Sequence, residues 1–306
     1  MRILPLTVVL FLTATLLATA QVSVEVVVEQ EQFLRDEALP VKVRITNRSG
    51  QTLRLGQDNE WLGFAIESLD GAVVSKLADA PVIGAFTLES AQVATRQVDL
   101  MPCFDLSQPG RYAVAATVKI KEWNDEVAGK PKGFEIVRGT RLWEQQFGVP
   151  ASGVTPEARK YTLQQANYRK QMKLYLRLTD ADEHRVFRVF ALGPLVSFSQ
   201  PEAQVDGTSQ LHVIFQTGAR SFLFFVLNPE GEAVIRQTYD YTATRPTLRS
   251  TEEGRIFVSG GARRLTASDI PAPLPAVAVN SKTTTNAAAA ASPPGEVRKN
   301  AKTPKK

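Results

Sequence analysis

Cysteine and histidine are scarce in this sequence: its 306 residues include one cysteine and two histidines. A single cysteine excludes a disulfide within the chain, so packing must stabilise the folded state. Cys103 lies in the apolar run Met101-Pro102-Cys103-Phe104, which favours a buried, unreactive thiol over a reactive one. Two histidines are also few for a hydrolytic or metal site built on imidazole groups.

Sequence motifs characteristic of known enzymatic reactions are missing as well. The sequence has no serine nucleophile elbow, no His-Glu-x-x-His, no Cys-x-x-Cys and no phosphate-binding loop. No cofactor and no metal ion is therefore predicted, and the sequence favours a protein without catalytic activity.

Most of the chain has no net excess of positive or negative charge. Residues 282–306 contain six basic residues and one acidic residue, which accounts for the whole net charge of +5. The remainder is electrically balanced, so its charge predicts no specific nucleic-acid binding. Attraction to anionic surfaces is expected only from the basic tail.

Residues 1–20 have the pattern of a signal peptide. Arg2 precedes an apolar run over residues 3–17, and Ala18-Thr19-Ala20 matches the small-x-small site of signal peptidase. We expect export to a periplasm, a cell surface or the extracellular space, with Gln21 as the first mature residue. An uncleaved N-terminal anchor is the alternative, because the run is almost long enough to span a membrane.

Residues 21–149 alternate between apolar and polar side chains in short segments separated by turn residues, a pattern typical of an antiparallel β-sandwich. Within this region, Gly110-Arg111-Tyr112-Ala113-Val114 resembles the start of the penultimate strand of immunoglobulin-like domains. That resemblance implies a corner tyrosine at Tyr112 whose hydroxyl binds nearby backbone. Valine stands at position 114 where antibody domains have a cysteine, and the resemblance carries no catalytic residue.

The remaining chain divides into three expected segments. Thr155-Pro156-Glu157 has the features of a helix start, so residues 150–172 are predicted to form a helical linker. Residues 173–265 are predicted to form a small antiparallel β-meander. Residues 266–306, rich in proline, alanine and lysine, are predicted to be disordered.

The meander contains a faint internal repeat. Pro201, Leu211 and Val213 correspond to Pro246, Ile256 and Val258 at an offset of 45 residues. Such spacing resembles the blades of secreted β-propellers, although two blades are too few to close a ring. The sequence leaves open a meander within one chain or a ring completed by several chains.

Four residues are candidates for ligand binding. Trp61 and Trp123 would form a platform for a ligand if exposed, with core packing as the alternative; the same alternatives apply to Trp143. Arg263 and Arg264 follow Gly260-Gly261 and could bind an anion, unless this segment only closes the last strand.

Other polar groups favour ordinary structural roles. The acidic stretch Asp180–Glu183 beside His184 offers oxygen ligands for a cation, but the sequence favours a solvated hairpin tip. His212 alternates within a strand, which favours a hydrogen-bonded sheet position. Asn47-Arg48-Ser49 matches the glycosylation sequon, which matters only in a host that glycosylates.

The leading hypothesis is an exported, non-catalytic binding or structural protein of the cell envelope, with a protein or glycan partner. One alternative is a secreted hydrolase acting on glycans, with Asp180 or Asp182 paired with Glu202. An immunoglobulin-like proteinase inhibitor is another, with an inhibitory loop at 77–86 or 121–139. In a further reading, the second β region serves only to assemble an oligomer.

Overall fold

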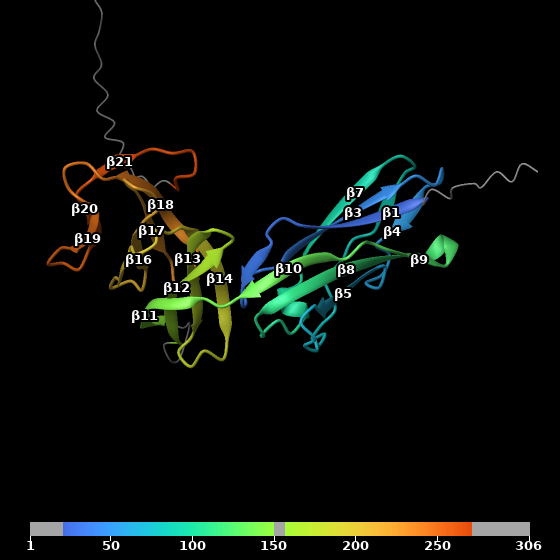
Figure 1. The fold of residues 1–306 in the computed structure, drawn as a ribbon, viewed down its shortest axis with the longest axis horizontal. Coiled ribbons are helices and arrows are strands. Elements are labelled where there is room, and N and C mark those ends of the chain that lie inside the picture. Colours follow the sequence, from blue (N-terminus) through green and yellow to red (C-terminus); the bar gives the residue numbers. More distant parts are fainter. Residues whose placement is uncertain (1–20, 150–156, 271–306) are drawn as a thin grey trace, which may run out of the picture. The chain divides into compact units, whose positions relative to one another are not determined.

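The computed structural model describes residues 21–149 and 157–270, and these residues are mainly β (Figure 1). The expected signal peptide, the start of the expected linker and all but the first residues of the expected tail lie outside the described residues.

Alternating side chains build the first sheet of the N-terminal region, as the sequence predicts. Its antiparallel strands, in spatial order, are β1 (Val22–Val28), β3 (Pro40–Asn47) and β7 (Val93–Asp99). Every second residue of β1 is buried, and Val41, Val43 and Ile45 of β3 are fully buried. One face of the sheet therefore enters the core while the other stays polar.

The second sheet of this region is ordered β2 (Gln32–Leu34), β10 (Lys132–Val137), β8 (Gly110–Ile120) and β5 (Leu62–Ser68). Strand β9 (Asp125–Ala128) also pairs with β8. A two-stranded ladder joins β4 (Leu53–Leu55) to β6 (Phe86–Leu88). The apolar core contains side chains from all of these sheets, an arrangement consistent with a β-sandwich.

Three local features characterise the N-terminal region. The Tyr112 hydroxyl donates a hydrogen bond of 2.5 Å to the carbonyl oxygen of Gln108, which is the contact expected of a corner tyrosine. Strand β2 pairs with β10 in parallel, unlike its neighbours. Residues 121–139, considered above as a protruding loop, instead form a short 3-10 helix (Lys121–Trp123), β9 and β10.

Asn47 is fully buried at the end of β3. Its Nδ2 donates to the carbonyl oxygens of Gln51 at 2.7 Å and Leu88 at 2.9 Å, and its Oδ1 accepts from the Ser49 backbone and hydroxyl. This side chain therefore holds together the turn after β3 and the strand β6.

The predicted helical linker is wrong over its described part. Residues 157–168 form strand β12 (Glu157–Tyr168), which is hydrogen-bonded on both sides within a four-stranded antiparallel sheet. Tyr161 and Leu163 on one face and Thr162 and Ala166 on the other are buried, so sheet pairing and burial outweigh the helical composition. The other strands are β11 (Thr140–Val149), β13 (Gln171–Asp180) and β14 (Val186–Pro194).

Strand β11 lies within residues 21–149, which were expected to form the sandwich. It instead pairs with β12 in the four-stranded sheet. The next sheet, again an antiparallel meander, is ordered β15 (Glu202–Val205), β16 (Leu211–Gln216), β17 (Ser221–Leu227), β18 (Ala233–Asp240) and β21 (Ala262–Arg264). The two sheets share one apolar core, in which Phe147 and Tyr161 stack at 4.1 Å.

The other face of the second meander is covered by the hairpin of β19 (Thr247–Ser250) and β20 (Ile256–Ser259). Leu248 and Ile256 pack there against Phe222, Phe224 and Val226. This hairpin matches the hairpin β15–β16 at the predicted offset of 45 residues, strand for strand. The repeat is thus a recurring hairpin, and no closed propeller is formed by the described residues.

A small apolar cluster joins strand β2 to one face of the four-stranded sheet β11–β14. Leu34 packs with Ala166, Tyr175 and Val189. Beside it, Arg177 forms an ion pair of 2.6 Å with Asp36. The two β regions therefore contact each other directly.

Candidate functional site

Strand β5 leaves one backbone edge of its sheet open. Its register with β8 pairs Leu62 with Val118 and Ser68 with Tyr112. The flanking bonds, Lys119 N–H to Trp61 carbonyl and Leu69 N–H to Arg111 carbonyl, show that odd-numbered residues bond to β8. Phe64 and Ile66 therefore direct their N–H and C=O groups to the other side, where no backbone partner lies among the described residues.

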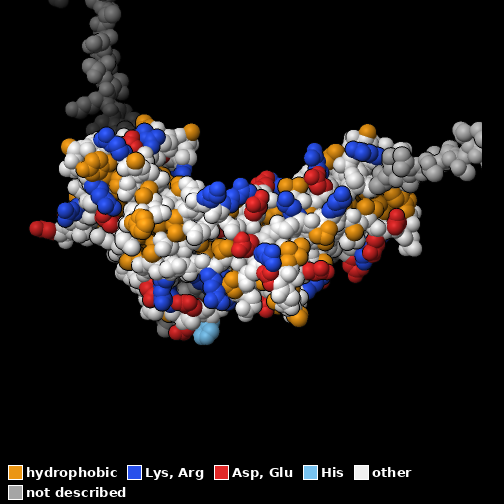
Figure 2. Space-filling model, viewed as in Figure 1, with side chains coloured by type: hydrophobic (Ala, Val, Ile, Leu, Met, Phe, Trp, Pro, Cys, Tyr) orange, Lys and Arg blue, Asp and Glu red, His pale blue; other side chains and the backbone are white. Residues whose placement is uncertain are grey.

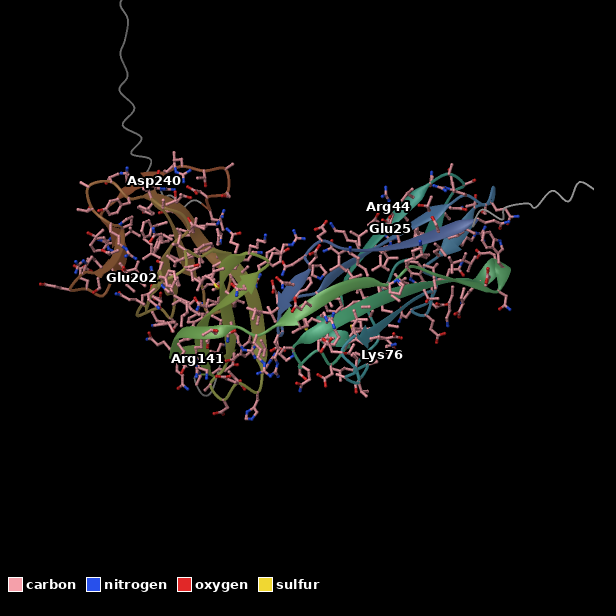
Figure 3. All side chains as sticks on the ribbon, in the orientation of Figure 1. Glu25, Arg44, Lys76, Arg141, Glu202 and Asp240 are labelled. Atoms are coloured by element: carbon pink, nitrogen blue, oxygen red, sulfur yellow. The ribbon has the colours of Figure 1, made fainter. Side chains whose placement is uncertain are left out.

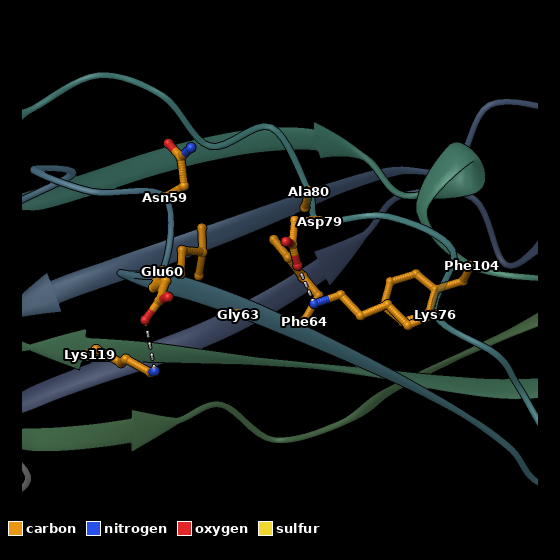
Figure 4. A pocket seen from close by; sticks show the side chains of 10 residues that line it. Asn59, Glu60, Gly63, Phe64, Lys76, Asp79, Ala80, Phe104 and Lys119 are labelled. Atoms are coloured by element: carbon orange, nitrogen blue, oxygen red, sulfur yellow. Dashed lines mark ion pairs between the residues drawn. The ribbon is translucent and has the colours of Figure 1, made fainter.

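A groove of about 500 Å³ runs beside this open edge (Figure 4). Leu62, Gly63 and Phe64 of β5 line one side, and Lys76, Asp79, Ala80 and Phe104 line the other. The second wall is held in place because the N–H groups of Leu77 and Ala78 donate to the Cys103 carbonyl oxygen at 2.8 and 3.3 Å. The groove thus has two fixed walls.

Charges in the groove are balanced. Lys119 lies 3.9 Å from Glu60, and Lys76 lies 2.6 Å from Asp79, which the dashed lines in Figure 4 mark. The hydrogen bond from Lys76 lowers the pKa of the Asp79 carboxyl. These exposed pairs leave the apolar side chains of Leu62, Phe64 and Phe104 as the neutral part of the lining.

The long connection between β5 and β6 exposes an unusual number of apolar side chains. The exposed fractions are 56% for Leu69, 93% for Val73, 65% for Leu77 and 83% for Ile83. Isolated exposed apolar residues are ordinary, but four within residues 69–85 are an unusual concentration for one connection.

The outer strands of the sheet β11–β14 are interrupted in ways that β5 is not. The outer strand β14 carries two register shifts and ends at Pro194, and β11 carries one. The edge of β2 is covered, because Gln32 Oε1 accepts the Arg169 N–H at 2.5 Å. Strand β5 has no proline, no bulge and only one charged residue, Glu67, so it lacks the usual protection against strand addition.

The three tryptophan side chains lie in or against the apolar cores. Trp61 is only 4% exposed, and its indole N–H donates to the Val82 carbonyl oxygen at 3.1 Å. Trp123 is half-buried against the same core, with its indole N–H 3.3 Å from Gln51 Oε1. Trp143 packs against the core of the second region. All three side chains take the alternative role in packing.

Arg263 and Arg264 already have acidic partners. Arg264 Nε lies 2.9 Å from Asp240, and Arg263 lies 3.8 Å from Asp269. The Gly261 N–H is bonded to the Thr244 carbonyl oxygen, so the turn closes β20 rather than presenting a free amide. Asp240 and Glu202 are labelled in Figure 3.

The acidic candidates serve local structure. Asp180 accepts the Arg185 N–H at 2.9 Å, Glu183 pairs with Lys160, and Glu202 accepts the Leu248 N–H at 2.8 Å. Among the described residues, no hydrogen bond joins Glu202 to Asp180 or Asp182. His212 is buried, with its Nε2 2.9 Å from Asp206.

The described residues contain no group of three or more histidine, cysteine or acidic residues placed to hold a metal ion. Within residues 21–149 and 157–270, no helix is both long and apolar enough to cross a bilayer.

Sequence reasoning predicted short strands within residues 21–149 and drew attention to the loop at 77–86, but it did not predict a groove between a strand and this loop. Comparison of the chain with protein-family models, with curated proteins and with solved structures finds no match.

Proposed function

We propose that this chain is a non-catalytic binding protein that captures an extended polypeptide segment at the groove beside β5. The open backbone edge at Phe64 and Ile66, beside a groove that Leu62, Phe64 and Phe104 line together with charged residues, is the observation that carries the proposal. An incoming segment would add to the sheet as a further strand, with backbone hydrogen bonds supplying affinity and the groove selecting side chains.

The binding region would be an immunoglobulin-like domain. The parallel pairing of β2 with β10 and the corner contact of Tyr112 support this proposal. Because such folds host many functions, the fold by itself indicates no partner.

Of the two partner classes expected from the sequence, a polypeptide fits the site better than a glycan. A row of free N–H and C=O groups is complementary to another polypeptide backbone. Glycan binding would be favoured by exposed aromatic platforms, whereas Trp61 is buried and Trp123 is half-buried. Export to the cell envelope, proposed from residues 1–20, would place the partner there.

Hydrogen exchange can test strand addition residue by residue. Peptides of eight to ten residues would be selected from a displayed random library on residues 21–306, and the tightest peptide would then be added. We expect the amides of Phe64 and Ile66 to become protected, because they gain partners. The amides of Gly63 and Ala65, already bonded to β8, provide the internal control and should change little.

A pair of variants tests the groove itself. Ala80→Trp fills the lined space, whereas Ala78→Trp places the same side chain on an exposed position outside the lining. We expect the first to weaken peptide binding at least about tenfold and the second to leave it unchanged. Unprotected Phe64 and Ile66 amides in the complex, or equal binding by both variants, would refute capture at β5.

A further inference from the structure

A second surface lies on the C-terminal region, at one end of its stacked sheets. Because the strands are antiparallel, alternate turns gather at the same end. Backbone hydrogen bonds connect them in series: Leu195 N–H to Met172, Val196 N–H to Gln216, Tyr241 N–H to Arg220 and Gly261 N–H to Thr244. We call these turns, residues 169–170, 195–200, 217–220, 241–246 and 260–261, the basic rim.

The basic rim contains cations and no acidic residue. Its charged residues are Arg169, Lys170, Arg220 and Arg245, all exposed. Arg169 pairs with Glu31, whereas no described carboxylate forms an ion pair with the other three. Beside the rim, at the upper border near β21, Figure 2 shows lysine and arginine side chains with an acidic side chain among them.

The opposite end of the same sheets is acidic. Its turns, residues 181–185, 206–210, 228–232 and 251–255, contain seven acidic residues and two arginines. Contacts from Tyr161 to Ser209 and Asn228, and from Arg159 to Pro229, place the turns at 206–210 and 228–232 at this end. The region is therefore electrically polarised, although its total charge is nearly balanced.

An exposed phenylalanine, Phe198, lies in the turn 195–200 of the basic rim. Its side chain is fully exposed, and its backbone φ of 70° lies in the left-handed region that a phenylalanine seldom adopts. The loop is held on both sides, by Leu195 bonded to Met172 and by Ser199 bonded to Val196. An exposed aromatic ring on strained but anchored backbone costs stability and gains no contact within the chain, which points to a role in binding.

We infer that the basic rim docks on an anionic lipid surface, with Phe198 entering the interface between headgroups and acyl chains. Cations at the same end of the sheets as an exposed aromatic side chain are complementary to such a surface. The acidic opposite end would orient the region by repulsion. The exposed Tyr241, stacked near Arg220 at 5.9 Å, adds a second amphipathic ring at the same end.

Flotation with vesicles of phosphatidylglycerol and phosphatidylcholine tests this inference on residues 21–306, with pure phosphatidylcholine as the neutral comparison. The variant Lys170→Glu with Arg245→Glu should lose at least about tenfold in vesicle binding. Arg249→Glu with Arg255→Glu, exposed on the hairpin β19–β20 and its turn, changes the net charge equally and should bind as the unsubstituted chain does.

Phe198→Gly separates lipid from other polyanions. Glycine tolerates the positive φ, so this variant should be at least as stable as the parent, yet it should bind vesicles less tightly. Its binding to dextran sulfate should not change, since that polymer offers no apolar interior. Equal vesicle binding by the two charge variants, or equal loss of vesicle and dextran sulfate binding in Phe198→Gly, would overturn the inference.

Discussion

At the scale of single residues, Glu37 is a buried carboxyl whose charge is only partly compensated by its surroundings. It is 7% exposed, and its carboxylate accepts the Leu34 N–H at 2.8 Å and a bond from Gln30 at 3.2 Å. Burial raises its pKa above the ordinary 4.5, and the hydrogen bonds and Lys173 only partly offset this. Burial conversely lowers the pKa of Lys173. Burial therefore disfavours the charged form of both side chains.

We predict that this carboxyl makes stability depend on pH. Above pH 4.5 the folded state holds the Glu37 proton more tightly than the unfolded state, so the free energy of unfolding falls as pH rises toward the folded pKa. Glu37→Gln keeps an acceptor for Leu34 and removes the charge, so the free energy of unfolding of this variant should fall less over that range. Urea unfolding from pH 4 to 8 measures this. The control is Glu29→Gln, on an exposed side chain; identical slopes in both variants would contradict the prediction.

At the scale of elements, strand β12 shows where sequence reasoning failed and why. Residues 157–168 contain no proline or glycine and are rich in alanine, glutamine and charged residues, which locally favours a helix. Only its partners β11 and β13 make it a strand, and the left-handed Arg169, at φ 56°, closes its hairpin with β13. Segments with their own alternation, such as β1, β3 and β8, were predictable because one buried face specifies them.

The individual segments of the candidate site were predictable from the sequence, but their arrangement in space was not. Leu62, Phe64 and Ile66 alternate as a strand should, and the exposed apolar residues of 69–85 are visible in the sequence. An unpaired edge, however, is defined by the absence of a neighbour, which depends on the order of strands in the sheet. The contact between residues 76–77 and Phe104 likewise joins positions that no local pattern connects.

The hairpin β19–β20 should be essential to the second meander, because it covers one face of β16 and β17. Leu248→Ala removes a buried side chain from that contact and should lower the free energy of unfolding by about 2–4 kcal/mol. The neighbouring exposed Arg249→Ala should change it by less than about 0.5 kcal/mol. Urea denaturation compares the two, and a loss below 1 kcal/mol for Leu248→Ala would show that the hairpin contributes little.

At the scale of the whole molecule, the chain has separate cores. The buried core of the sandwich contains only residues between Val22 and Ile136, and the large core of the C-terminal region begins at Phe147. Only the small cluster around Leu34 and Tyr175 contains residues of both regions. Each region therefore has the apolar material to fold by itself.

We expect a fragment of residues 21–138 to fold cooperatively. Its strands and core are complete, and the surface that it newly exposes is limited to Leu34 and its neighbours. Leu34→Ser in the same fragment would suppress self-association through that surface. Circular dichroism and dispersed amide resonances are the readouts. A fragment without cooperative unfolding would mean that the sandwich needs the C-terminal sheets.

The burial of Asn47 bears on how this protein can be produced. In a eukaryotic secretory pathway, the sequon Asn47-Arg48-Ser49 would be offered to the glycosylation machinery while the chain is still unfolded. The acceptor nitrogen is the same Nδ2 that bonds Gln51 and Leu88 in the folded state. A sugar attached there could not be accommodated in a fully buried site, so modification and folding exclude each other. Expression in a glycosylating host should therefore yield a secreted fraction without the sugar, and a retained, misfolded fraction that carries it.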